Sequence, residues 1–287
     1  PAGALILFVT LGSYALGMTM GQAQGFGSPL PLALLGLALI GLVALLRVES
    51  SLPQPMIDLR MFRNRLFSFN LLMGFMVFIV LAGAFILPFF LELVKGYPTP
   101  VVGLLMMANP IAMGLTAPLA GALSDRFGTR IISLAGLFLL AVAAYAMTTI
   151  SVETGPLGIV LRLIPFGIGF GLFQSPNNSA ILGSAPRERL GIASGLVALS
   201  RTLGNSSGLP LMGAIFTAQV LAASGLPEGI DITTAPPAAL VAGINGTYGV
   251  ATLVVLAAAG LALVGIRLDR RERAAARAVA AEHSAKD

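Results

Sequence analysis

Residues Phe67–Phe90 read FSFNLLMGFMVFIVLAGAFILPFF and contain no charged side chain. A helix crosses the hydrocarbon core of a bilayer with about 20 consecutive apolar residues, so this stretch is long enough to span a membrane. Lipid offers the backbone no hydrogen-bond partners, and a segment of this kind must satisfy its own polar groups as an α-helix. The stretch therefore predicts a membrane-spanning helix.

Further apolar stretches of similar length lie on both sides of this one. Charged residues make up 10% of the chain, against about 25% in typical soluble domains, which is too few to cover a water-exposed surface. The alternating pattern of membrane β-strands is absent, so we expect an all-α fold, a polytopic bundle of transmembrane helices with a loop over 221–246. The predicted spans are 1–20, 30–47, 67–90, 101–123, 131–150, 157–181, 191–219 and 247–266.

Basic residues collect on alternate connections between these spans, as Lys and Arg do on cytoplasmic loops. The remaining connections hold only Lys95 among basic residues. This alternation predicts that the chain start and the C-terminus both lie in the cytoplasm, and that residues 267–287 continue the last helix as a basic tail. Attraction to anionic lipid and binding to a specific partner are the two interpretations of that tail. The alternating set is Arg47, Arg60, Arg63, Arg65, Arg126, Arg130, Arg187, Arg189, Arg267, Arg270, Arg271, Arg273 and Arg277.

Composition argues against several classes of function. The net charge of +5 is dispersed between apolar segments and does not form a basic stripe, so nucleic-acid binding is not expected. The chain has no cysteine and one histidine, His283, in a polar tail, so no metal site, cofactor or catalytic cluster is expected and the chain is not predicted to be an enzyme. Pro1 opens an apolar stretch without a basic n-region, so we do not predict a signal peptide there and expect a preceding N-terminal portion.

Polar residues concentrate in the third, fourth, sixth and seventh predicted spans. A polar side chain in hydrocarbon is costly and normally faces a protein interior or an aqueous cavity, so these four spans are expected to line a cavity. Phe69, Phe75 and Phe173 would add apolar contacts, and the fifth and eighth spans are expected to be peripheral. The substrate-cavity candidates are Asn70, Asn109, Gln174, Asn177 and Asn178.

The segment GALSDRFGTR, Gly121–Arg130, joins two predicted spans by a very short loop in which Gly128 permits a tight turn. It resembles the signature loop of the major facilitator superfamily, Gly-x-Leu-x-Asp-Arg-x-Gly-Arg-basic, with Thr129 in place of the first basic residue of the last pair. The resemblance implies that contacts of this loop are made and broken as the cytoplasmic side closes and opens. A simple basic anchor at the membrane face is the alternative. The gating candidates are Gly121, Asp125, Arg126, Gly128 and Arg130.

Two other segments resemble the fourteen-helix drug:proton antiporter branch of that superfamily. Leu161–Gly208 is similar to a matching region of the branch, and Pro53–Phe67, PQPMIDLRMFRNRLF, is similar to the linker before its ninth helix. The resemblance implies eight of fourteen helices and a missing N-terminal six-helix bundle. It divides the chain into two extra central helices (1–50), a cytoplasmic linker (51–66), a C-terminal six-helix transport bundle (67–266) and a basic cytoplasmic tail (267–287).

The sixth predicted span contains glycines and prolines at regular positions. Gly167, Gly169 and Gly171 follow no strand, so they favour close helix packing over a dinucleotide-binding loop. Pro165 and Pro176 are expected to kink or unwind the span. Unwinding would free carbonyl groups for a binding site, whereas a kink could be purely structural.

Two arginines, Arg162 and Arg201, lie within predicted spans. Arg162 occupies a place that resembles a membrane-embedded arginine near the cavity of the superfamily. Its guanidinium could attract an anion or tune the pKa of a proton-carrying carboxylate. For both arginines the alternative is that the side chain extends to the membrane interface.

The resemblance as a whole implies a secondary transporter. It implies alternating access in a lipid bilayer and export of small lipophilic or cationic compounds in exchange for protons, without a cofactor. No Asp or Glu lies in the middle of a predicted span, so the coupling carboxylate is expected in the missing half. A major facilitator transporter of one specific metabolite or nutrient is the alternative.

Overall fold

The computed structural model describes residues 2–52, 55, 57–225 and 232–284, with the backbone alone for residues 2 and 269–284. Within these ranges every regular element is helical, and eight helical segments are long and apolar enough to cross a membrane, which confirms the predicted number and fold class. The helices are α1 (Ala2–Gln24), α2 (Pro29–Ser51), α3 (Arg65–Gly83), α4 (Ile86–Leu93), α5 (Thr99–Met106), α6 (Ala108–Phe127), α7 (Thr129–Met147), α8 (Pro156–Gly183), α9 (Leu190–Ser224) and α10 (Pro237–Ser284), with 3-10 turns η1 (Leu59–Arg63), η2 (Arg187–Arg189) and η3 (Ile232–Thr234).

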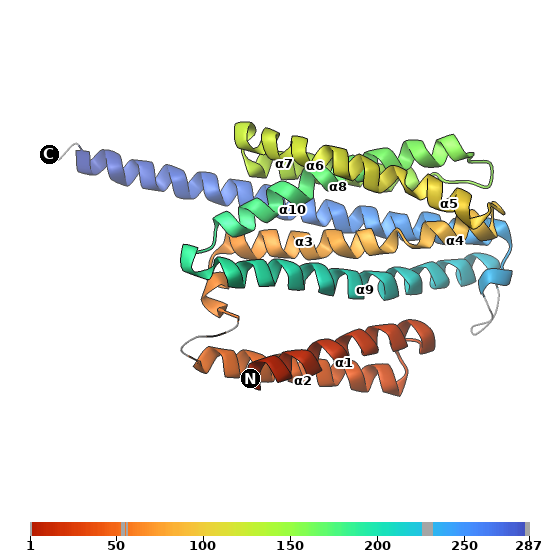
Figure 1. The fold of residues 1–287 in the computed structure, drawn as a ribbon, viewed down its shortest axis with the longest axis horizontal. Coiled ribbons are helices and arrows are strands. Elements are labelled where there is room, and N and C mark those ends of the chain that lie inside the picture. Colours follow the sequence, from red (N-terminus) through yellow and green to blue (C-terminus); the bar gives the residue numbers. More distant parts are fainter. Residues whose placement is uncertain (1, 53–54, 56, 226–231, 285–287) are drawn as a thin grey trace.

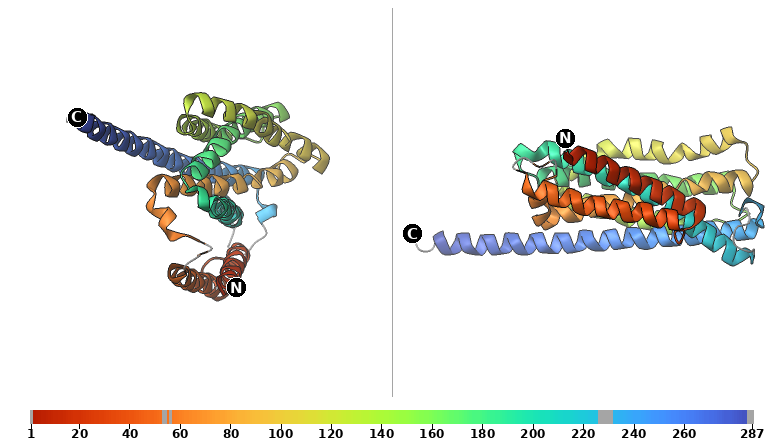
Figure 2. Two further views of the ribbon diagram at one scale, coloured as in Figure 1. Left: turned by 60° about the vertical axis from the view of Figure 1, so that its left-hand side comes forward. Right: turned by 90° about the horizontal axis from the view of Figure 1, so that it is seen from below.

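The first two helices form a hairpin that lies to one side of all the others (Figure 1). α1 packs against α2 and, along its length, against α9. In the remaining bundle α8 packs on α6 and α7, α3 packs on α9, and α10 contacts α3, α7 and α9. Figure 2 shows the hairpin apart from this bundle and α10 projecting far beyond it.

Two of the eight spans are interrupted, and both interruptions precede a proline by one helical turn. The third span divides into α3 and α4 at Ala84 and Phe85, before Pro88, and the fourth divides into α5 and α6 at Met107, before Pro110. Proline has no N–H to donate to the preceding turn and its ring crowds the carbonyl there, so a helix is easily broken at this distance.

Other prolines leave their helices intact. α8 is continuous over Pro165 and Pro176, so of the two expected outcomes, a kink or unwinding, the unwinding does not occur. Neighbouring helices hold α8 closely enough to keep its backbone helical, as is common for proline in membrane-spanning helices.

The glycines of α8 confirm the predicted close packing. A Cβ on Gly167 would lie 2.3 Å from the carbonyl oxygen of Asn109 in α6, and one on Gly169 would lie 2.6 Å from the backbone nitrogen of Leu140 in α7. Gly171 approaches α6 in the same way as Gly167. Glycine therefore allows α8 to touch the backbones of two helices at once. Phe173, expected at a cavity, is 1% exposed in the adjoining core.

Two expectations need correction. The loop predicted over 221–246 is much shorter, because α9 continues to Ser224 and α10 already begins at Pro237; residues 226–231 lie outside the described part. Proline fits the first turn of a helix, and the turns that follow it pack on α9, where a Cβ on Gly243 would touch Val220 and Phe216.

α7 and α10 are also less peripheral than the polar pattern indicated. Each has an exposed apolar face, with Phe138 at 66% and Leu253 at 67%, but half of the span in α7 is buried and α10 packs on three helices. The small number of polar residues in these two helices fits a position with lipid on one side and mostly apolar neighbours on the other.

Candidate functional site

The polar side chains of the bundle meet where α3, α8 and α9 approach one another. Asn177 Nδ2 of α8 donates to the carbonyl oxygen of Asn70 in α3 at 3.2 Å, and Ser200 Oγ of α9 donates to the carbonyl oxygen of Leu71 at 2.9 Å. Both side chains pass close to Gly74, where a Cβ would stand in van der Waals contact, 3.5 Å from Asn177 Nδ2 and 3.7 Å from Ser200 Oγ. Two hydrogen bonds therefore join α8 and α9 to one turn of α3.

Asn177 has spare hydrogen-bonding capacity at this junction. The residue is 2% exposed, and its Oδ1 atom is buried without a donor in the described part of the chain. An unpaired buried amide oxygen costs about 1–3 kcal/mol, so a donor that reached it would be bound favourably.

Arg201 lies further along α9, close to the same junction. Its guanidinium carbon stands 5.8 Å from the ring centroid of Phe78 in α3, and Phe78 meets Phe170 of α8 edge to face at 5.6 Å between centroids. A cation over an aromatic face is favourable, but a ring satisfies none of the five guanidinium N–H groups. Arg201 is exposed, and no carboxylate among the described residues pairs with it.

An exposed polar stripe extends from Arg201 along α9. Ser194, Arg201 and Asn205 are spaced by seven and four residues, so they share one face of the helix, and all three are exposed. A polar face on a membrane-spanning helix points to water or protein, not to lipid. Sequence reasoning recognised the seventh span as rich in polar residues but did not identify this face.

Arg162 contrasts with Arg201 because each of its three guanidinium nitrogen atoms donates a hydrogen bond. Nε donates to the carbonyl oxygen of Ala146 at 2.9 Å, Nη1 to that of Gly158 at 3.0 Å, and Nη2 to Thr149 Oγ1 at 2.8 Å. Ala146 lies in the last turn of α7, where a positive charge complements the exposed carbonyl groups of the helix end. Arg162 thus ties the start of α8 to the end of α7.

The five cavity candidates do not form one cluster. Asn70 and Asn177 share a hydrogen bond, whereas Asn109 packs against Gly167 at the contact between α6 and α8. Gln174 and Asn178 are half-buried on α8, and no hydrogen bond joins them to the other candidates in the described ranges.

The loop with the gating candidates is a turn of one residue. Gly128 separates α6 from α7 with φ of 90°, a backbone region that favours glycine, and its N–H donates to the Ser124 carbonyl oxygen at 2.8 Å, as Gly128 was predicted to allow. Gly121 is half-buried in the last turns of α6. Asp125 and Arg126 are exposed, and the Arg126 guanidinium lies 5.3 Å from the ring centroid of Phe127. Arg130 lines a cavity of about 20 Å³ with Asn70, so this loop and the polar junction are neighbours.

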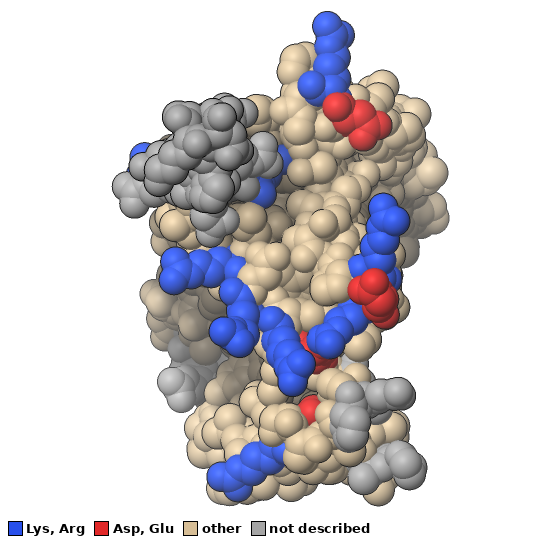
Figure 3. All heavy atoms as spheres, turned by 90° about the vertical axis from the view of Figure 1, so that its left-hand side faces the viewer, with Lys and Arg blue, Asp and Glu red and all other residues tan. Residues whose placement is uncertain are grey.

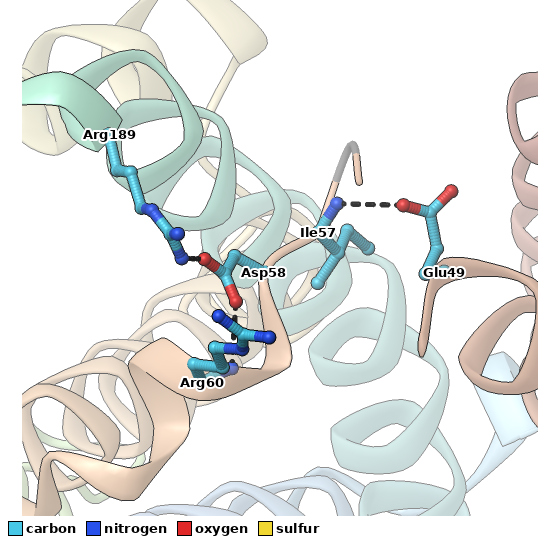
Figure 4. Close-up of polar contacts among 5 residues, drawn as sticks. All are labelled: Glu49, Ile57, Asp58, Arg60 and Arg189. Carbon is cyan, nitrogen blue, oxygen red and sulfur yellow. Dashed lines mark hydrogen bonds and ion pairs between the residues drawn. The ribbon is translucent and has the colours of Figure 1, made fainter. Parts of the chain in front are cut away.

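A further polar cluster, missed by sequence reasoning, lies in the linker between α2 and α3. The Asp58 side chain is 6% exposed, accepts the Arg60 N–H at 2.9 Å and forms an ion pair with Arg189 of η2 (Figure 4). Glu49, 2% exposed in the last turn of α2, accepts the Ile57 N–H at 3.1 Å. Its position beyond the predicted end of the second span hid this glutamate. Pro53, Gln54 and Met56 of the linker lie outside the described residues.

The end of the molecule at which α3, α7 and α9 begin is basic. Figure 3 shows several Lys and Arg side chains and few acidic ones on this end. The exposed arginines contributed by the connections here are Arg47, Arg60, Arg63, Arg65, Arg126 and Arg187. α10 continues through the basic tail, as predicted. The structure describes only the backbone of this part, so it does not describe the side chains of Arg270, Arg271, Arg273, Arg277 and His283.

Sequence comparison with known proteins shows that this chain is similar to transporters. The sequence model of the Major Facilitator Superfamily matches residues 2–209. An uncharacterized transporter of Escherichia coli, YebQ, is 34% identical over 70% of this chain and 45% of its own length. The riboflavin transporter RibZ of Clostridioides difficile is 32% identical over 62% and 40%, and the multidrug transporter MdtP of Bacillus subtilis is 29% identical over 76% and 41%. The chain thus spans less than half the length of these relatives.

Proposed function

Because the chain belongs to the Major Facilitator Superfamily, we propose that it takes part in proton-coupled export of small lipophilic or cationic compounds by alternating access. The observation that carries the proposal is the similarity to MdtP, a protein named as a multidrug transporter, over 76% of this chain. The bundle supplies the matching physical feature, a membrane-embedded polar junction with spare hydrogen-bonding capacity.

In this proposal the chain forms one wall of the transport pathway. Asn177, Asn70, Gln174 and Asn178 would meet the substrate, and Asn109 would support the wall from the contact between α6 and α8. The opposite wall, another six-helix bundle, and the carboxylate that couples transport to protons would belong to a part of the transporter outside these residues. Both ends of this chain would lie in the cytoplasm, where the basic end of the bundle faces anionic lipid.

Arg201 would act across the pathway in this arrangement. An unpaired guanidinium within a membrane repels a cationic substrate unless an anion neutralises it. We therefore assign Arg201 to a carboxylate on the opposite wall, whose proton affinity the guanidinium lowers. Loss of the proton would strengthen this ion pair, and gain of the proton would release it.

The loop around Gly128 would couple formation and release of this ion pair to movements at the basic end of the bundle. Gly121, Asp125, Arg126, Gly128 and Arg130 lie on or beside the turn, and Arg130 and Asn70 share the wall of one cavity. A movement of α3 at the polar junction would therefore reach this turn directly.

Transport of one specific metabolite or nutrient is the second candidate function. The similarity to RibZ, named as a riboflavin transporter, favours it. A planar amphiphilic substrate of that class would be held by stacking on aromatic rings and by hydrogen bonds to side-chain amides.

The experiment is ethidium accumulation in efflux-deficient bacteria that express the protein as its gene encodes it, with and without a protonophore. We expect lower accumulation that the protonophore abolishes, and Asn177→Leu should abolish the effect as well. Thr252→Val is the matched control, because the Thr252 hydroxyl bonds only the Tyr248 carbonyl of its own helix, at 2.8 Å. Unchanged ethidium accumulation at confirmed membrane levels of the wild-type protein, together with protonophore-sensitive transport of riboflavin in either direction, would replace the proposal with the metabolite transporter.

A further inference from the structure

A polar pocket of about 240 Å³ lies beside the linker, between the end of α2, η1 and η2. Four charged side chains line it: Glu49, Asp58, Arg60 and Arg189. Asp58 and Arg189 neutralise one another as an ion pair. The other two charges decide what the pocket is able to bind.

Glu49 and Arg60 are incompletely satisfied. One carboxylate oxygen of Glu49 accepts the Ile57 N–H, but the other, Oε1, is buried without a donor in the described chain. Arg60 uses its backbone N–H to bond Asp58, and its exposed guanidinium has no acceptor among the described residues. The buried Glu49 oxygen is costly without a donor, and the exposed Arg60 guanidinium is free to bind an anion, so the pocket favours a ligand that carries a donor cation and an anion together.

An apolar hollow of about 370 Å³ lies between the hairpin and the bundle. Leu11 and Leu42 line it from the hairpin, and Phe75 and Leu199 line it from the bundle. Two of its other lining residues border the polar pocket, since Leu45 is one helical turn from Glu49 and Ile57 directly precedes Asp58. Its polar wall groups are already bonded: Thr10 Oγ1 donates to the Ile6 carbonyl at 2.7 Å, and the Tyr14 hydroxyl bonds that of Ser207. The volume is that of a typical ligand site, and its lining suits hydrocarbon.

We propose that phosphatidylethanolamine binds between the hairpin and the bundle, with one of its two acyl chains in the apolar hollow and its headgroup in the polar pocket. The ammonium group donates hydrogen bonds to Glu49, and the phosphate accepts them from Arg60. The surrounding bilayer supplies such a lipid at every moment. A choline headgroup has no N–H to give, and an anionic glycerol headgroup satisfies Arg60 but is repelled by Glu49. The site is independent of the transport reaction.

The test measures which lipid stays with the purified protein. The protein as its gene encodes it is equilibrated in detergent with equal amounts of phosphatidylethanolamine, phosphatidylcholine and phosphatidylglycerol, repurified, and its retained lipid is quantified by mass spectrometry. We expect phosphatidylethanolamine to exceed phosphatidylcholine at least fivefold. Glu49→Gln should bring that ratio close to one and raise phosphatidylglycerol, and Arg60→Gln should lower both phosphatidylethanolamine and phosphatidylglycerol.

Arg47→Gln is the control for these variants, because Arg47 is an exposed arginine of the same helix that does not line the pocket. It should leave all ratios unchanged. Leu42→Trp, which fills the hollow without altering a charge, should lower retention of all three lipids. Equal retention of phosphatidylethanolamine and phosphatidylcholine by the wild-type protein would overturn the proposal, as would a preference that survives Glu49→Gln in protein of unchanged elution volume.

Discussion

Arg162 and Arg201 carry the same charge in the same bundle, yet their surroundings give them different roles. Arg162 has three hydrogen-bond acceptors, one in α7, one in the turn that follows α7 and one in α8, and is part of the scaffold. The Arg201 guanidinium lies over an aromatic ring, and none of its five N–H groups has a protein acceptor in the described part. A side chain held over Phe78 in this way is positioned, but it is not neutralised.

The first prediction concerns the charge of Arg201. Arg201→Gln should reduce protonophore-sensitive ethidium export at least tenfold, because the proposed carboxylate on the opposite wall loses its partner. Arg201→Lys, which keeps the charge, should retain part of the activity. Accumulation assays at matched membrane levels test this, with Arg47→Gln as the control. Equal export by Arg201→Gln and wild type would exclude a role for this guanidinium in transport.

The second prediction concerns the closest helix contact. Gly167→Ala would place a Cβ 2.3 Å from the Asn109 carbonyl oxygen and 2.9 Å from the Ala112 side chain. Separating α6 from α8 should destabilise the protein by about 1–3 kcal/mol, the usual cost of overpacking. Thermal unfolding in detergent measures the change. Gly114→Ala is the matched control, since a Cβ on Gly114 of α6 meets no atom within 4 Å, and it should not lower the melting temperature.

At the scale of elements, the linker between α2 and α3 is fastened at two points. Asp58 bonds η1 and pairs with Arg189 in η2, while Glu49 bonds the linker backbone at Ile57. The hairpin, the start of α3 and the connection from α8 to α9 therefore share one polar contact region. A displacement of any one of them strains the other two.

The third prediction follows from the Asp58–Arg189 pair. Asp58→Asn and Arg189→Gln should each destabilise the protein by about 1–3 kcal/mol, because each leaves a partner with unsatisfied hydrogen-bonding groups. The double variant should cost less than the sum, and a double-mutant cycle by thermal unfolding gives the coupling. Additive effects within error would mean that the two side chains do not interact.

The elements show how far the sequence determined the fold. The apolar stretch Phe67–Phe90 predicted a span correctly, because one bilayer-length run of apolar residues has few alternatives to a helix. It did not predict the break at Ala84, since Pro88 breaks its helix whereas Pro165 does not, and only the neighbouring helices distinguish the two. The start of α10 was missed because a helix opened by proline looks like a loop to local reasoning.

The candidate site was less predictable than the fold. Asn70 and Asn177 were identified from polarity alone, and the structure joins them. Asn109 carried the same signal but lies at a packing contact with Gly167. Asp58 and Arg189 are far apart in the sequence, so their pairing required the tertiary structure. Glu49 was visible in the sequence but lay beyond the predicted end of its helix.

On the scale of the whole molecule, the exposed polar stripe and the apolar faces of α7 and α10 lie on different helices. The polar junction and the exposed stripe of Ser194, Arg201 and Asn205 involve α3, α8 and α9, while α7 and α10 present apolar faces such as Phe138 and Leu253. Such a distribution is expected of one wall of a transport pathway. It supports the proposal that another bundle faces the polar side of this chain.

The fourth prediction belongs to this scale. The 287-residue chain alone, reconstituted in liposomes, should give no protonophore-sensitive ethidium flux, because a single wall encloses no pathway. The protein as its gene encodes it should restore the flux under the same conditions. Comparable rates from both preparations would show that these residues contain a complete transport site.

α10 is long enough for a small change in its tilt to move its far end by a large distance. At about 1.5 Å per residue this helix is roughly 70 Å long, more than twice the thickness of a bilayer's hydrocarbon core. A tilt of about 10° at its start would carry the far end through about 12 Å. Small rotations of the buried bundle would therefore produce large displacements near residue 284. Energy transfer from a fluorescent dye attached there would measure these distance changes in real time.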